Sequence, residues 1–99
     1  MPARSGHSKK YISTATTTNV PGNATDASCI LHTITINGGT AGTITVYDDS
    51  NGGVTAARRI AIIETIGATN PVSLIYDAIM NNGITIVTAA ATDVTVTWA

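Results

Sequence analysis

Two possible metal ligands, Cys29 and His32, lie three residues apart in this chain. The residues around them are typical of a strand, and on a regular strand residues 29 and 32 point to opposite faces. They could then not share one ion, and only His7 and scattered acids remain to complete a tetrahedral site. We therefore expect no metal site here, a small buried Cys29 and a His32 at the margin of the core.

The segment Asp48-Asp49-Ser50-Asn51-Gly52-Gly53 resembles the oxygen-rich start of a calcium-binding loop. The helix-flanked calcium loop needs glycine at its sixth position and glutamate at its twelfth. Counted from Asp49, those positions hold Val54 and Ile60, so the motif fails. We expect a turn in which the aspartates bond to the backbone, with a loose surface cation site as the alternative.

Catalytic patterns are absent from the sequence. Glu64 and Asp77 could in principle pair as acid and base, but nothing in the sequence places them together. No Gly-x-Ser-x-Gly elbow, phosphate-binding loop or dinucleotide fingerprint is present, and the glycine pairs are typical of turns. A serine acting with His32 has no supporting motif. We predict that the chain is not an enzyme and needs neither cofactor nor small-molecule substrate.

Charge is distributed unevenly along the chain. The first ten residues carry Arg4, Lys9 and Lys10 and no acid, whereas residues 11–99 carry two arginines and six acids. This basic segment could contact an acidic protein surface or a phosphate backbone, or be a solvated tail. Nucleic acid is not an expected partner, because the body is acidic and Tyr11 beside Lys9-Lys10 is the only aromatic with basic neighbours.

The composition favours β structure. The chain contains 18 Thr, 13 Ile and 7 Val among 99 residues, no Phe and a single Cys. Charged residues make up 11%, against roughly 25% in ordinary soluble domains. These features exclude a coiled coil, a disulfide scaffold and a charged disordered chain, and no apolar run reaches the roughly 18 residues of a membrane span.

Alternating apolar and polar residues, separated by turn clusters, predict about seven strands. The expected strands cover residues 11–18, 30–37, 43–47, 56–66, 72–76, 84–87 and 94–98. Strands 30–37 and 43–47 form the best expected hairpin, and residues 56–66 also fit a helix loosely. We predict an all-β domain over residues 10–99, an antiparallel β-sandwich or small jelly-roll-like barrel, preceded by a flexible basic arm at residues 1–9.

The outward positions of these strands hold threonine where a solvated sheet normally displays charge. Threonine suits a pleated surface and does not repel another protein. The threonines expected to face outward are Thr33, Thr35, Thr43, Thr45, Thr85, Thr95 and Thr97. We infer that part of this surface is covered by copies of the chain or by a partner. Tyr11, Tyr47 and Tyr76 are the candidate surface or interface aromatics.

Three segments together resemble a known family: Leu31-His32-Thr33-Ile34-Thr35-Ile36-Asn37, Gly42-Thr43-Ile44-Thr45-Val46-Tyr47-Asp48, and Asn82-Gly83-Ile84-Thr85-Ile86-Val87-Thr88 running on to Trp98. They look like the small all-β virion proteins of tailed bacteriophages, in particular capsid decoration (cement) or head-auxiliary proteins. The similarity spans roughly residues 30–98 and consists of strand and turn motifs.

The resemblance implies a protein that binds the assembled phage head, often as a homotrimer, and bridges neighbouring major capsid protein subunits. Arg4, Lys9 and Lys10 would then lie on an arm that contacts a neighbouring subunit. The expected location is the virion, after synthesis in the host cytoplasm, since the sequence shows no secretory signal. The alternatives are a receptor- or glycan-binding head-fibre or tail module, and a head–tail connector or tail-tube subunit.

Overall fold

The computed structural model describes residues 8–20, 29–50, 52–65 and 72–99. Within these ranges it contains eight strands and one short 3-10 turn. They are β1 (Ser8–Ile12), β2 (Thr16–Asn19), β3 (Cys29–Gly39), β4 (Thr43–Tyr47), η1 (Ala56–Arg58), β5 (Arg59–Glu64), β6 (Val72–Met80), β7 (Thr85–Thr88) and β8 (Thr92–Trp98).

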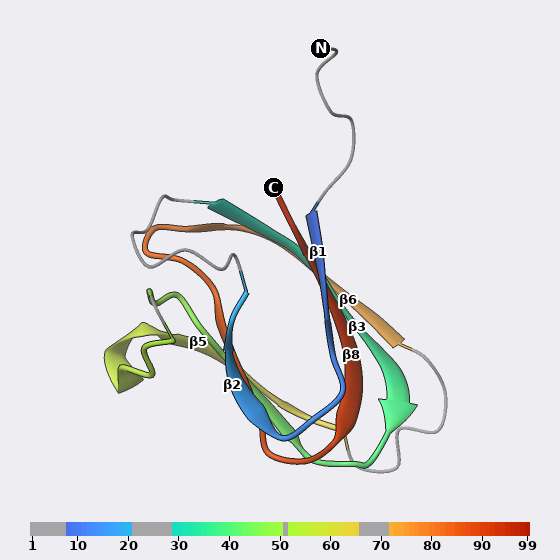
Figure 1. Cartoon of the computed structure of the whole chain (residues 1–99). Helices are drawn as coiled ribbons and strands as arrows, with labels where there is room; N and C mark the ends of the chain where they lie inside the picture. The colour runs from blue at the N-terminus through green and yellow to red at the C-terminus, as the bar shows by residue number, and fades with distance from the viewer. Residues whose placement is uncertain (1–7, 21–28, 51, 66–71) are drawn as a thin grey trace, which may run out of the picture.

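The strands form two antiparallel four-stranded sheets that pack against each other (Figure 1). The first sheet has the order β1-β8-β3-β6 and the second sheet the order β2-β7-β4-β5. Among the described strands, only β4 and β5 are both consecutive in sequence and paired. This is the jelly-roll arrangement of eight strands in two sheets, and it confirms the predicted all-β antiparallel sandwich.

The core lies between the two sheets and consists of aliphatic side chains from alternate strand positions. Ile34 and Val96 of the first sheet and Ile44 and Ile86 of the second are completely buried. Burying each such side chain favours folding by about 1.5–3 kcal/mol. The β-branched composition thus serves both strand formation and the apolar layer.

The prediction that residues 30–37 and 43–47 form a hairpin is wrong. β3 belongs to the first sheet and β4 to the second, so the intervening glycine-rich turn carries the chain across the sandwich. Gly39 makes this possible with a φ of +80°, a conformation that favours glycine. The expected strand 11–18 is likewise divided: residues 13–15 take the chain from β1 in one sheet to β2 in the other.

The expected side-chain alternation of residues 30–36 is corrected by a β-bulge. The pairing of β3 with β6 shifts between Leu31 and Thr33, which reverses the faces on either side of His32. Leu31 is therefore fully buried, while Ile30 is 42% exposed.

The segment 56–66, expected to be a strand rather than a helix, does contain the strand β5 from Arg59 to Glu64. The 3-10 turn η1 precedes this strand, and Ile66 lies outside the described residues. β1 begins at Ser8, inside the segment expected to be an arm, so Lys9 and Lys10 both belong to the first sheet. Arg4 lies outside the described residues.

Candidate functional site

The outer surface of the first sheet combines a block of threonines with three exposed isoleucines, and we name it the threonine face. Its central part holds Thr95 and Thr97 of β8 beside Thr33 and Thr35 of β3. Ile75 and Ile79 project from the edge strand β6 and are 71% and 70% exposed, and Ile30 of β3 lies opposite Ile79. Isolated exposed apolar side chains are normal, but a group on one face indicates a contact surface. The exposed Asp77 lies between Ile75 and Ile79 on the same side of β6.

The hydroxyl groups of the threonine face bond to one another. The Oγ1 atoms of Thr33 and Thr97 are 2.5 Å apart, and the hydroxyl oxygens of Thr35 and Ser73 are 3.0 Å apart. The Asn37 side-chain amide donates to Thr95 Oγ1 at 3.2 Å. Because these polar groups already have protein partners, covering them costs less free energy than covering unpaired hydroxyls.

Charged groups lie at the borders of the threonine face. Lys9 of β1 is exposed in the row that continues through Thr97 and Thr33 to Ile75. At a second border the Tyr11 hydroxyl bonds to the Asp93 carboxylate, and this bond is the main reason why the pKa of Tyr11 lies above its ordinary value of 10.0. Tyr11 is 59% exposed, as expected of a surface aromatic.

Asp77 lies in the β6 bulge with a φ of 47°, the one described non-glycine residue with positive φ. Tyr76 and Asp77 lie between the β6 residues that pair with Leu31 and Thr33, so that they oppose His32. His32 Nδ1 contacts Asp77 Oδ1 as a hydrogen-bonded ion pair across the two strands. Aspartate tolerates this left-handed conformation better than most residues, which explains its place in the bulge.

We expect Asp77→Val to lower the free energy of unfolding by about 1–3 kcal/mol, because a β-branched residue is strained at positive φ. Asp77→Asn should change it by less than about 1 kcal/mol, since asparagine accepts this φ and an exposed ion pair contributes little. Urea unfolding of both variants measures the difference. Equal losses would show that the bulge backbone imposes no such requirement.

On the second sheet, the exposed charged residues Arg59 and Glu64 lie at the two ends of β5. Ile62 of β5 is 55% exposed and pairs with Thr45, which pairs in turn with Val87 of β7. We name this row, together with the half-buried Tyr47, the Ile62 face. The sandwich therefore exposes apolar side chains on two opposite surfaces, the threonine face and the Ile62 face.

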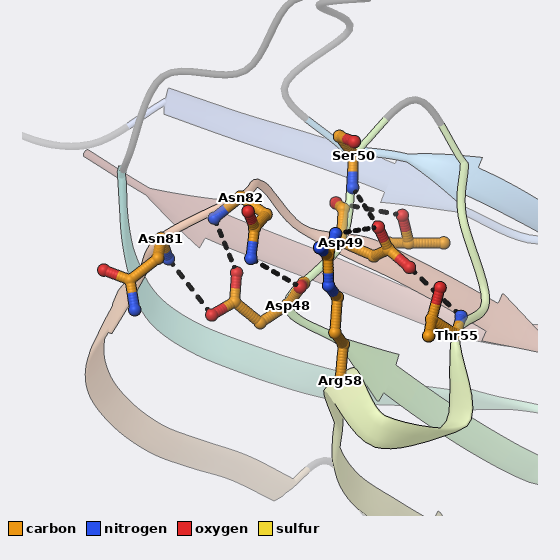
Figure 2. Close-up of polar contacts among 8 residues, drawn as sticks. Asp48, Asp49, Ser50, Thr55, Arg58, Asn81 and Asn82 are labelled. Carbon is orange, nitrogen blue, oxygen red and sulfur yellow. Dashed lines mark hydrogen bonds and ion pairs between the residues drawn. The ribbon is translucent and has the colours of Figure 1, made fainter.

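Asp48 connects the two sheets at one end of the sandwich. Its carboxylate accepts hydrogen bonds from the backbone N–H groups of Asn81 at 3.1 Å and Asn82 at 2.8 Å (Figure 2). These residues form the turn that leaves β6 in the first sheet, whereas Asp48 follows β4 in the second. The carboxylate thus fixes how the chain passes between the layers.

Asp49 organises the loop that follows, and it is only 4% exposed. Its carboxylate accepts bonds from the N–H groups of Ser50 at 2.8 Å and Thr55 at 3.0 Å, and from the Arg58 guanidinium at 2.9 Å (Figure 2). These bonds lower the pKa of Asp49 from 3.8 to about 2. The largest effect comes from the Thr55 N–H, followed by the Ser50 N–H, the Thr55 hydroxyl and Arg58.

The Asp48–Asp49 loop matches the predicted turn in which aspartates bond to the backbone, and it does not present its carboxylates to a cation. The donors of five residues occupy oxygens that a calcium ion would need. Thr85, expected to face outward, is instead fully buried, and its hydroxyl donates to the Asp49 carbonyl at 3.4 Å. This loop positions elements of the fold.

The structure separates the other residues considered for chemistry. Glu64 lies on β5 of the second sheet and Asp77 on β6 of the first, so the two acids do not converge. Cys29 is half-buried and lines an open hollow of about 310 Å³ with Ile30, Ile79 and Ala99. No group of three His, Cys, Asp or Glu residues that could hold a metal ion occurs in the described ranges.

The three candidate aromatics have different environments. Tyr11 lies on the threonine face and Tyr47 is half-buried on the Ile62 face. Tyr76 is partly buried and packs against the core. Sequence reasoning missed the exposed Ile75 and Ile79, whose only signal was their alternation with Leu74 and Tyr76.

The described architecture is that of a jelly-roll domain with exposed isoleucines on both outer faces. Comparisons with models of known protein families, with curated proteins and with solved structures find no match. No helix in the described part of the chain has the length and hydropathy required to cross a membrane.

Proposed function

We propose that this chain is a virion structural protein, a decoration or cement protein that binds the assembled head of a tailed bacteriophage. The observation that carries the proposal is the presence of exposed isoleucines on the two opposite outer faces of one sandwich. The jelly roll also occurs in viral capsid proteins, which is consistent with this role although a fold alone does not define a function.

In this role the protein connects the capsid to further copies of itself. The Ile62 face, on the edge strand β5, would contact the major capsid protein, while the threonine face would be covered by another copy of the chain. Each contact can be weak, because many linked copies add their binding free energies across the shell. Lys9 and Lys10, exposed on β1, remain the proposed basic contacts to a neighbouring subunit.

Co-sedimentation with purified heads that lack the protein tests this function. Wild-type protein at micromolar concentration should sediment with the heads and raise the temperature at which they release DNA. Ile62→Lys should weaken binding at least about tenfold, because it places a charge in a desolvated contact. Val54→Lys is the matched control, since Val54 is 52% exposed in the loop before β5 and belongs to neither face.

Wild-type protein that stays in the supernatant would contradict the proposed function. Equal binding by the two lysine variants would contradict the role of the Ile62 face.

A further inference from the structure

We propose that the threonine face is a dimer interface, in which two copies of the chain pack face to face about a two-fold axis that runs along β3. This inference rests on the proposed function in one respect only: it names what covers the second face of the sandwich. The partner is a second copy, because the shape, the hydrogen bonding and the charges of the face complement themselves.

The shape complementarity comes from the strand order. β3 lies between β8 and β6 in the first sheet, so a two-fold axis along β3 places β6 of one copy over β8 of the other. The axis keeps each residue at its own level along the strands, so Ile75 of one copy faces Thr97 of the other and Ile79 faces Ala99, just past the end of β8. The ridge of large side chains on β6 thus meets a trough of small ones. Each ridge therefore fills the trough of the partner, as inner faces interdigitate in β-sandwiches.

The trough can lose its water at low cost. Its Thr33 and Thr97 hydroxyls bond to each other, and Thr95 accepts a bond from Asn37. An interface that left these groups unpaired would be weakened by each one, but here their partners come from the same copy. The threonines can thus pack against isoleucine methyl groups through their own methyl groups.

The charges at the border are complementary under the same symmetry. β1 lies two strands from the axis and β6 lies one, so β1 of one copy extends just beyond β6 of the other. Lys9 is level with Ile75 in the strand register and comes beside the partner's edge strand near Asp77. The pairing brings lysine to aspartate twice, once on each side of the axis, which favours one orientation of the two copies.

The area that the threonine face can bury limits the expected affinity of the dimer. Three strands about 4.8 Å apart, each with about seven contacting residues, give a footprint roughly 14 Å by 23 Å. An interface of this size belongs to the class below about 1,200 Å² of total buried surface, which holds weak and transient complexes. The dimer should therefore form in the micromolar range in solution and be favoured where copies are concentrated on a shell.

Sedimentation equilibrium over about 1–300 µM tests the dimer. Wild-type protein should move from the mass of one chain to the mass of two, and Ile75→Lys should weaken this association at least about tenfold. Lys9→Glu should weaken it less, and more strongly at low salt than at high salt. Val54→Lys, exposed and off the face, should associate like wild type.

A cross-linking experiment checks the position of the axis. A residue that lies on a two-fold axis faces the same residue of the other chain. Packed sheets lie about 10 Å apart, which sets the distance between the two. In a Cys29→Ser background, Thr35→Cys on β3 should therefore be cross-linked to itself by a bismaleimide of about that length. Thr17→Cys on β2 of the second sheet is the control and should remain a single chain.

Three results would overturn the dimer: a single-chain mass at every concentration, a three-chain mass such as a trimer gives, or association that Ile75→Lys leaves unchanged. None of these results bears on the sedimentation of the protein with heads, which depends on Ile62. Conversely, a dimer that fails to bind heads would leave this inference intact and remove the proposed function.

Discussion

Asp49→Asn should lower the melting temperature by roughly 10 °C or more, the largest effect expected of any single polar substitution in the described residues. The NH2 group of the amide faces either the Thr55 N–H, or the Ser50 N–H and the Arg58 guanidinium, and in both orientations Arg58 loses its anion. The buried carboxylate holds the whole connection from β4 to β5, so its loss frees that loop. Thermal unfolding followed by circular dichroism measures the change.

The same carboxylate gives the protein a defined sensitivity to acid. Its pKa is lowered to about 2 in the folded chain, so its contribution to stability is complete above about pH 4. That contribution is lost as the pH falls from about 4 to about 2, where the folded-state carboxylate takes up a proton. The difference in melting temperature between wild type and Asp49→Asn should shrink over this window.

Asp77→Asn is the control for Asp49→Asn, because it removes a carboxylate that is exposed and has one side-chain partner in β3. It should change the melting temperature by only a few degrees. An Asp49→Asn variant as stable as this control, or a difference that persists unchanged at pH 2, would contradict the role given to the loop.

Gly39→Ala should be the most damaging substitution of a glycine, with a loss of about 2–4 kcal/mol in the free energy of unfolding. Gly39 has a φ of +80°, and an added Cβ would lie 2.7 Å from the Ala91 carbonyl oxygen and 2.8 Å from the Asp93 nitrogen. Both contacts are with backbone at the start of β8, which cannot move away without breaking its pairing with β3. Urea unfolding measures the loss.

Gly52→Ala separates the two causes of this effect. Gly52 has a similar φ of +75° but no atom within 4 Å of an added Cβ, so only the backbone strain applies. We expect a loss of about 1–2 kcal/mol there. Equal losses at the two glycines would mean that the close approach of β8 to Gly39 contributes nothing.

The sequence predicted the strands of this protein better than their pairing. The alternation of apolar and polar residues in 43–47 and 94–98 identified the buried side chains correctly, because one face of each strand packs on the core. In 72–76 it did so less well, since Leu74 and Tyr76 are only partly buried and Val72 is 44% exposed. The same alternation does not tell whether two consecutive strands pair or cross to the opposite layer. The turn between β3 and β4 has the composition of a hairpin, yet it joins the two sheets.

Long-range contacts explain what the sequence could not indicate about the candidate site. His32 meets Asp77 only because a bulge in β6 brings it there, and no local pattern marks that bulge. The low charge of the outer strands did point to a contact surface. Which isoleucines border it depends on β6 being an edge strand, a property of the whole sheet order.

The pairing of β1 with β8 has a consequence for how the molecule is made. Ser8 lies opposite Trp98, so the first sheet cannot close while residues near the carboxyl end are still in the ribosomal tunnel. The nascent chain therefore cannot complete the jelly roll until Trp98 has left the tunnel. Such distant pairing predicts slow folding, on the scale of milliseconds to seconds, with unpaired edges exposed to neighbouring chains until it ends.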